Sequence, residues 1–262
     1  MPPFLTLQDI ASGLRTLGLE RGAAVEVHSS LSSLGFVEGG AAAVIQALID
    51  VVGEDGAIVM SAYRVSPLLP LTEEEKTRGI IAKVSFLAEN SDEKSGMGVI
   101  ADTFRRWPRT CLGQGIHRIC AWGKNAHLHS QGYAYLLSVD GWALLLGVDI
   151  NRCSCMHTAE DQFIWPPAIV DHFRLPEEIG RQYPDTQWFV QYQDPQKPVP
   201  DNAWEKVRIE AESRGLIRRG YIGQAECLLF KARPVVAIYE EALRSDPSSL
   251  FGVPKEKTND PL

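Results

Sequence analysis

The chain has 262 residues, of which 45% are hydrophobic and 23% charged, a composition typical of a folded protein with a substantial core. Its formal net charge is −7, which argues against nucleic acid as a partner, because phosphate binding requires clustered Lys and Arg. An acidic surface is compatible with a cationic ligand. We find neither an apolar run near the ~20 residues that span a bilayer nor a signal peptide, so we expect a cytoplasmic protein without membrane contact.

The five cysteines do not suggest a disulfide framework in a chain of this length. We expect reduced and mostly packed thiols at Cys111, Cys120, Cys153, Cys155 and Cys227.

The first quarter of the chain alternates between helical and extended patterns. Apolar spacing predicts a helix over Leu7–Gly18, with Thr6 as its N-cap and Gly18 as its stop. The elements expected next are a strand at Ala23–Val27, a loop of small residues at His28–Gly35, a helix at Ala41–Val52 and a strand at Gly56–Met60. This order of strand, loop, helix and strand is that of an α/β unit.

Beyond this unit the pattern continues, with two interruptions. Residues 66–95 are mixed in character and are expected to form an insertion that lies over the surface. Residues 165–200 are expected to form a loop-rich segment with one or two short strands. The other expected helices are at Gly98–Arg106, at Asn202–Arg214 and at Pro234–Leu243, and one more begins near Cys155. The other expected strands are at Ile116–Trp122, Trp142–Val148 and Ala225–Lys231. The tail after Asp246 is expected to be frayed.

The loop His28–Gly35 is the first candidate for binding chemistry. A Ser- and Gly-rich turn between a buried strand and a helix lets backbone N–H groups approach an anion closely. Neither a Walker pattern nor G-x-G-x-x-G occurs, so a nucleotide triphosphate or dinucleotide is unsupported.

The second candidate is the stretch Asn151–Glu160, which follows the apolar strand. Open α/β sheets place ligands at the carboxyl ends of their strands. His157 and Glu160 are three residues apart, so on a helix they share a face, and a carboxylate beside an imidazole raises its basicity. The same spacing also fits a structural histidine satisfied by its neighbours.

Two other chemistries are open for this stretch. Cys153, Cys155 and His157 alternate as C-x-C-x-H, and thiolate with imidazole suits zinc, although no further ligand pair follows at a standard spacing. His127 and His129 form H-x-H, in what reads as a polar loop. Either Cys153 or Cys155 could also carry an acyl group, but nothing in the sequence marks either thiol as activated.

Three blocks, in matching order, closely resemble the aminoglycoside 3-N-acetyltransferase family, and the resemblance extends over roughly the whole chain. The blocks are Val27–Gly35 followed by Gly39-Gly40, Met97–Pro108, and Leu144–Val148 followed by Met156–Glu160. The family resemblance implies a three-layer α/β/α fold with a mixed central β-sheet, unlike the common acetyltransferase fold. It implies one acetyltransferase domain over residues 1–262, with the variable segments near 66–95 and 165–200.

The resemblance also implies direct acetyl transfer from acetyl-CoA to an amine in a ternary complex, with no metal. By position, His157 matches the catalytic histidine and Glu160 its partner carboxylate. Acetyl-CoA contacts are implied for His28, Ser29, Ser30, Leu31, Ser32, Ser33 and Gly35, and for the cleft-lining Met97 and Phe104.

The hypothesis that follows is a monomeric or homodimeric enzyme that acetylates the 3-amino group of an aminoglycoside's deoxystreptamine ring. Neutral His157 would deprotonate the amine, the Ser29–Ser33 loop would stabilise the oxyanion, and Asp149 and Asp161 would hold the cationic acceptor. The chain departs from the family at Gln114–His117 and at Arg152–Cys155, and in its insertion around Leu69–Lys94. The alternatives are therefore an acetyltransferase for another metabolite amine, a CoA-binding protein without turnover and a zinc hydrolase.

Overall fold

The computed structural model describes residues 4–253 and is organised around one mixed β-sheet. The seven strands lie in the order β4 (Cys111–Leu112), β5 (Ile119–Gly123), β2 (Ala57–Ser61), β1 (Ala24–Ser29), β6 (Trp142–Leu146), β9 (Ala225–Lys231) and β8 (Ile217–Ile222). Strand β1 runs parallel to both β2 and β6, whereas the outer pairs are antiparallel. The central position of β1 puts the segment that follows it in the middle of one sheet edge.

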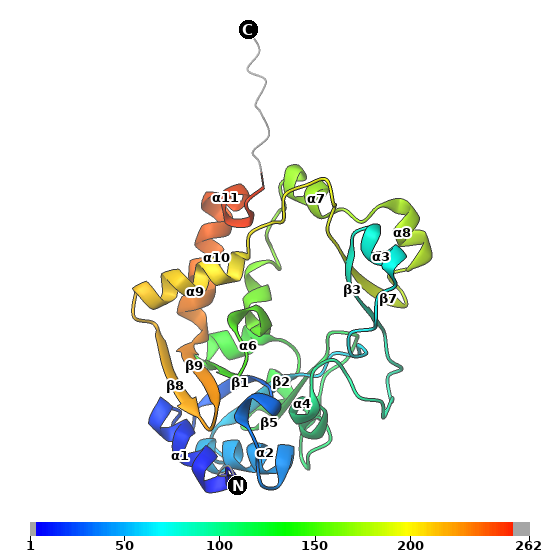
Figure 1. Ribbon diagram of the computed structural model, residues 1–262. Helices are drawn as coiled ribbons and strands as arrows, with labels where there is room; N and C mark the ends of the chain where they lie inside the picture. The colour runs from blue at the N-terminus through cyan, green and yellow to red at the C-terminus, as the bar shows by residue number, and fades with distance from the viewer. Residues whose placement is uncertain (1–3, 254–262) are drawn as a thin grey trace.

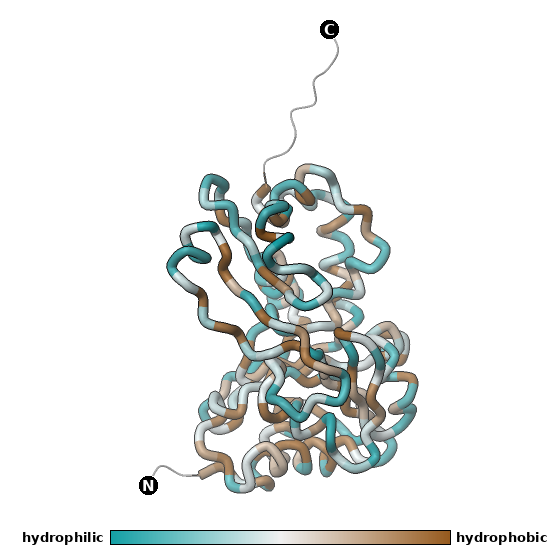
Figure 2. The backbone as a smooth tube through the Cα atoms, turned by 90° about the vertical axis from the view of Figure 1, so that its right-hand side faces the viewer, coloured by the Kyte–Doolittle hydropathy of each residue, from teal (hydrophilic) through white to brown (hydrophobic). Residues whose placement is uncertain are grey.

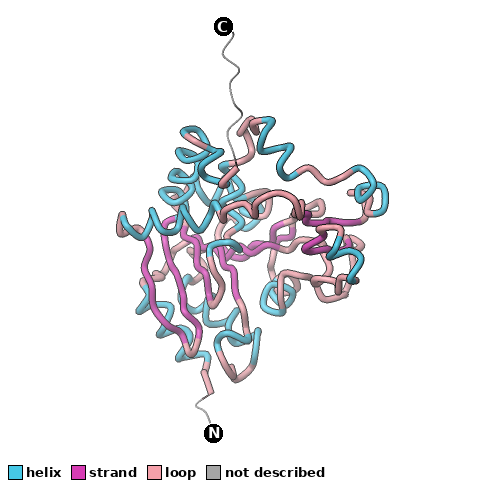
Figure 3. Tube along the Cα trace, turned by 45° about the horizontal axis from the view of Figure 1, so that its top comes forward, coloured by secondary structure: helices cyan, strands magenta, loops and turns pink. Residues whose placement is uncertain are grey.

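Helices cover both faces of this sheet, as Figure 3 shows with helices on either side of the strands. Side chains on a strand alternate between the faces. In β6, Leu144 and Leu146 pack into one apolar core, and Ala143 and Leu145 into the other. The predicted three-layer α/β/α architecture is therefore confirmed.

The first helical layer contains α1 (Leu7–Leu17), α2 (Gly40–Val52) and α4 (Val99–Phe104). Helix α1 begins where the sequence predicted, because Thr6 and Asp9 form a reciprocal capping box, and it ends at Gly18 in the left-handed conformation. Its buried residues Ile10 and Leu14 lie on one stripe against the sheet.

The second layer contains mostly C-terminal elements. They are α5 (Ala126–His129), α6 (Tyr133–Ser138), the 3₁₀ turns η2 (Ile150–Arg152) and η3 (Ser154–Ala159), α9 (Ala203–Ser213), α10 (Ala232–Ser245) and α11 (Pro247–Phe251). Helix α10 is the main cover of this face, with Val235, Val236 and Tyr239 fully buried. Figure 2 shows hydrophobic stretches alternating with hydrophilic ones along the chain.

A small lobe stands beside the main sheet (Figure 1). It contains α3 (Glu73–Thr77), β3 (Ile80–Ser85), α8 (Glu177–Gln182) and β7 (Trp188–Tyr192), and α7 (Pro167–Phe173) connects it to the body. Strand β3 pairs antiparallel with β7, from Ile80 opposite Tyr192 to Ser85 opposite Trp188. The insertion and the loop-rich segment, far apart in sequence, thus form one two-stranded sheet.

Several local predictions were wrong. The helix expected from near Cys155 is the 3₁₀ turn η3, with Glu160 as its C-terminal cap. The start of the tail expected to be frayed is instead the helix α11, whose N-terminus the Asp246 side chain caps; residues 254–262 of that tail lie outside the described range. His127 and His129 lie on α5 rather than in a polar loop, and His129 is buried.

Candidate active site

The two candidate segments lie together at one edge of the sheet. Strands β1 and β6 are parallel, with Ser29 opposite Leu146, so the segments that follow them leave from the same edge. The pairing continues one residue further, because Ser30 N–H donates to the Leu146 carbonyl at 3.0 Å. The topology therefore brings the serine loop to the start of the histidine segment, the arrangement typical of ligand sites in α/β proteins.

Hydroxyl groups hold the serine loop in a compact turn. Ser33 Oγ donates to Ser30 Oγ at 2.8 Å, and Ser30 Oγ lies 3.1 Å from Ser32 Oγ. Residues Ser32–Leu34 form a single 3₁₀ turn that ends at Gly35, whose φ of 87° suits glycine. Gly147 is needed beside this turn, since a Cβ there would lie 2.6 Å from the Ser33 Cβ and its φ is 71°.

The histidine segment is held to β1 by two side chains that face the second helical layer. Cys155 N–H donates to Glu26 Oε1 at 3.0 Å, and the Ser154 nitrogen lies 3.1 Å from His28 Nε2. His28 Nε2 also lies 2.6 Å from Glu26 Oε1. His28 is therefore engaged with β1 and η3 rather than presented on the serine loop.

His157 itself is accessible. Its side chain is 55% exposed. The His157 Nδ1 lies 2.8 Å from Glu160 Oε2, and the Trp204 ring packs edge-on against the imidazole, with 4.8 Å between the two ring centroids. The other Glu160 oxygen accepts a hydrogen bond from the Tyr239 hydroxyl at 2.7 Å. Burial and the neighbouring Glu160 raise the pKa of Tyr239, which keeps this hydroxyl protonated as a donor. The result is a fixed row of Tyr239, Glu160 and His157, with the imidazole at the surface.

The two predicted acceptor-binding carboxylates differ in their surroundings. Asp149 Oδ1 accepts from the Ile150 N–H at 2.6 Å and lies 3.8 Å from Arg208 Nε, so part of its charge is already compensated. Asp161 is exposed and has no hydrogen-bond or ion-pair partner in the described part of the chain. Asp161 is the better placed of the two to meet a cation.

Of the two cleft-lining residues predicted in the block Met97–Pro108, one cannot face a cleft. Phe104 is fully buried in the first core, so it supports α4 from inside. Met97 and Leu31 are only partly buried against the same core. The turn at Gly98 adjoins the serine loop, since a Cβ on Gly98 would lie 4.0 Å from the Ser29 carbonyl oxygen.

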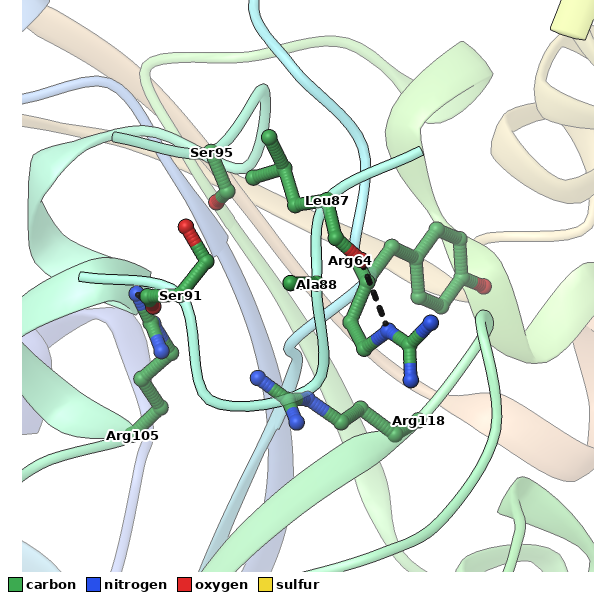
Figure 4. Close-up of a pocket in the computed structure, with 8 residues that line it drawn as sticks. Arg64, Leu87, Ala88, Ser91, Ser95, Arg105 and Arg118 are labelled. Carbon is green, nitrogen blue, oxygen red and sulfur yellow. Dashed lines mark hydrogen bonds between the residues drawn. The ribbon is translucent and has the colours of Figure 1, made fainter. Parts of the chain in front are cut away.

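A pocket lined by three arginines, Arg64, Arg105 and Arg118, lies near this block (Figure 4). The guanidinium groups bind carbonyl oxygens of the bordering segment: Arg64 that of Leu87 at 3.1 Å, and Arg118 that of Glu89 at 2.8 Å. Burial and the neighbouring Arg105 and Arg64 lower the pKa of Arg118. Arg105 is paired with Asp102 at 3.1 Å and Arg64 with Glu89 at 3.9 Å, so much of the positive charge around this small pocket is compensated.

The thiols of the histidine segment are buried. A hydrogen bond from Cys155 favours the Cys153 thiolate, but burial and the negative Glu26 outweigh it and raise the pKa of Cys153. The pKa of Cys155 is raised by its contact with Cys153 and by burial. These surroundings disfavour a cysteine acyl carrier. A zinc site that includes His157 is also disfavoured, because that ring points away to Glu160.

Sequence reasoning missed Glu26, Tyr239 and Trp204. Glu26 had a visible signal, since it is a charged residue within an apolar strand. Tyr239 and Trp204 had none, because each lies on a distant helix and its contact with the site depends on the tertiary fold.

Fold and site together define a three-layer α/β/α protein with a carboxylate-held histidine at the carboxyl end of parallel strands. The family model described as Aminoglycoside 3-N-acetyltransferase matches residues 27–244. The chain belongs to the aminoglycoside 3-N-acetyltransferase family, as its sequence blocks predicted.

Its relatives match over most of their length. The SPbeta prophage-derived aminoglycoside N(3')-acetyltransferase-like protein YokD of Bacillus subtilis is 32% identical, over 90% of this chain and 91% of that protein. Aminoglycoside N(3)-acetyltransferase VII of Streptomyces paromomycinus is 28% identical, over 88% and 89%. The crystal structure of YokD superposes with a TM-score of 0.67 at 28% identity and covers 94% of this chain and 96% of that one.

Proposed function

We propose that the protein transfers the acetyl group of acetyl-CoA directly to the 3-amino group of an aminoglycoside's deoxystreptamine ring. The observation that carries the proposal is the accessible His157, held by Glu160 and Tyr239 at the sheet edge beside the serine loop. Solved proteins of the same fold are described as AAC-IIIb with CoASH and as AAC(3)-IVa in complex with apramycin. The reaction would take place in the cytoplasm, where thiols such as the five free cysteines stay reduced.

In the proposed reaction, His157 acts as the general base. An ammonium group must lose a proton before it can attack a thioester, and a neutral imidazole can take that proton near neutral pH. Glu160 binds Nδ1 and thereby leaves Nε2 to face the amine. The amine nitrogen attacks the thioester carbonyl, and the coenzyme thiolate leaves. No step of this transfer uses a metal ion.

The serine loop and the neighbouring turn would hold the coenzyme. N–H and hydroxyl groups at Ser29–Ser33 would stabilise the oxyanion as it forms. Met97 and Leu31 present partly buried apolar surface for the pantetheine chain.

The test is the release of coenzyme A thiol in the presence of acetyl-CoA and a panel of aminoglycosides. A matched acceptor, with its 3-amino group already acetylated, is the control. We expect release with the free amine and none with the blocked one, and mass spectrometry should place one acetyl group on that nitrogen. Equal release from both acceptors would contradict the assigned position. No release from any amine, with a shift in Tm on adding coenzyme A, would indicate a binding protein.

An acetyltransferase for a smaller metabolite amine is the alternative. Simple mono- and diamines therefore belong in the same panel, and a higher kcat/KM for one of them would favour this alternative.

A further inference from the structure

A second cluster of reactive side chains lies behind η3, separate from the exposed His157. Glu26, Cys153 and Cys155 are fully buried, and their ligand atoms all lie within 4.8 Å of one another. Among residues 4–253, this is the one group of three or more such side chains with metal-ligand spacing. The proposed acetyl transfer uses none of the three.

The two oxygens of Glu26 have different surroundings. Oε1 accepts from the Cys155 N–H at 3.0 Å and lies 2.6 Å from His28 Nε2. Oε2 accepts a weak hydrogen bond from the Cys153 thiol at 3.8 Å, and among the described residues it has no nitrogen or oxygen donor. A buried carboxylate oxygen without a strong partner is costly. One oxygen is thus oriented by neighbours, as ligating carboxylates are in metal sites, and the other faces the Cys153 sulfur.

Two of the three ligand–ligand distances are close to those around a tetrahedral metal ion, and the third, between the Cys155 sulfur and a Glu26 oxygen, is within 4.8 Å. Zinc–sulfur bonds of about 2.3 Å and zinc–oxygen bonds of about 2.0 Å place two sulfur ligands about 3.8 Å apart, and a sulfur and an oxygen about 3.5 Å apart. The structure has 3.5 Å between the Cys153 and Cys155 sulfurs and 3.8 Å between the Cys153 sulfur and Glu26 Oε2. Each distance is within about 0.3 Å of the tetrahedral value.

We propose that Glu26, Cys153 and Cys155 bind one thiophilic divalent cation of the zinc type. On binding, both thiols would release their protons to solvent and coordinate as thiolates, with the carboxylate as the third protein ligand. The ion would link Glu26 on β1 to Cys153, between η2 and η3, and to Cys155 in η3. Its role is structural, since it fixes the turn that carries His157 without contacting either substrate.

The primary test is the metal content of the intact protein, purified without chelator and then incubated with Zn²⁺ and desalted. We expect about one equivalent of zinc, and with Co²⁺ in its place the absorption bands of a tetrahedral thiolate complex. Cys153→Ser, Cys155→Ser and Glu26→Gln should each lose most of the bound metal. Cys227→Ser is the matched control, because Cys227 is also fully buried but packs in the opposite core.

X-ray absorption on the zinc-loaded wild type keeps the proposal testable even where a variant fails to fold. Two sulfur ligands and at least one oxygen ligand per zinc would support it. Any other sulfur count would overturn it, as would a folded wild type that takes up no more Zn²⁺ or Co²⁺ than Cys153→Ser does. In that case the cluster is a pair of protonated thiols packed on a hydrogen-bonded carboxylate.

Discussion

At the residue scale, the site depends on how one imidazole is held. Glu160 binds His157 through Oε2 and Tyr239 through Oε1, so the carboxylate has little freedom to turn away. The buried Tyr239 hydroxyl belongs to α10, and the exposed imidazole of His157 belongs to η3. A packed helix thus fixes the position of a surface group, which is what the proposed role of His157 as general base requires.

Replacing His157 with Ala should lower kcat about 10²–10⁴-fold, because the acceptor amine loses its base. Steady-state coenzyme A release with acetyl-CoA and a reactive aminoglycoside measures the change. His127→Ala is the control, since His127 is an exposed histidine on α5. Full turnover by His157→Ala would remove this residue from the mechanism.

Tyr239→Phe should lower kcat by a smaller factor, about 10–100-fold, because a hydrogen bond to a charged group is worth about 1.5–3 kcal/mol. The ring stays in the core, so the Tm should change little compared with kcat. Tyr221→Phe, on the exposed strand β8, should leave kcat unchanged. If Tyr239→Phe lowers the Tm but not kcat, the hydroxyl serves stability and not catalysis.

At the element scale, the sequence predicted the major helices and strands well because their apolar spacing and caps are local. Helix α1 has its own capping box and α2 its own Gly53 stop, so neither depends on distant contacts for its ends. Strands β3 and β7 lack such signals, because each acquires its pairing partner more than a hundred residues away in the chain. Their periodicity is weak, since they form a small outlying sheet with little core beneath it.

The helix type expected from near Cys155 was wrong, but the pairing expected there was right. The Glu26 carboxylate and the His28 ring accept from the N–H groups of Cys155 and Ser154 at the start of η3. The segment itself has 3₁₀ hydrogen bonds, such as that from Glu160 N–H to the His157 carbonyl at 2.9 Å. In a 3₁₀ helix, residues three apart eclipse one another. The predicted pairing of His157 with Glu160 is therefore confirmed even though the predicted helix type was wrong.

The hydroxyl network of the serine loop should shape the coenzyme site. Ser30→Ala removes the hydroxyl that accepts from Ser33 and contacts Ser32, so the loop loses its internal bonds but keeps its backbone bond to β6. We expect KM for acetyl-CoA to rise about tenfold, the effect of about 1.4 kcal/mol, with kcat nearly unchanged.

Calorimetric titration with coenzyme A checks the same change without turnover. Ser138→Ala, at the end of α6, is the control and should bind coenzyme A normally. A Ser30→Ala protein with wild-type affinity would show that the hydroxyl network does not shape the coenzyme site.

At the scale of the whole molecule, the lobe is held together by polar contacts more than by a large core. The Glu75 carboxylate binds the Lys83 ammonium group and the Tyr183 hydroxyl, and it also caps α3 through the Thr72 N–H at 2.6 Å. One nearly buried side chain thereby connects α3, β3 and the end of α8. We expect the lobe to open more readily than the main sheet, because local stability follows local packing.

The pH dependence of the lobe follows from this carboxylate. Its bonds to Lys83, Tyr183 and Thr72 lower the pKa of Glu75 from 4.5 to about 2. A carboxylate with a lowered folded-state pKa contributes stability above its unfolded value, and that stability is lost as the pH falls from about 4.5 through about 2. Glu75→Gln should remove the contribution at neutral pH, because the amide keeps the shape but carries no charge for Lys83.

Hydrogen exchange at neutral pH separates this effect from general destabilisation. In Glu75→Gln, the amides of β3 and β7 should lose protection, whereas those of β1 and β6 should exchange as in the wild type. Glu73→Gln is the matched control, since Glu73 makes an exposed pair with Lys76 on the same helix. If all four strands lose protection together, the lobe unfolds with the main sheet and Glu75 contributes to the stability of the whole chain. If only β3 and β7 respond, the lobe opens as a unit of its own, and acid should loosen it before the histidine site at the main sheet is disturbed.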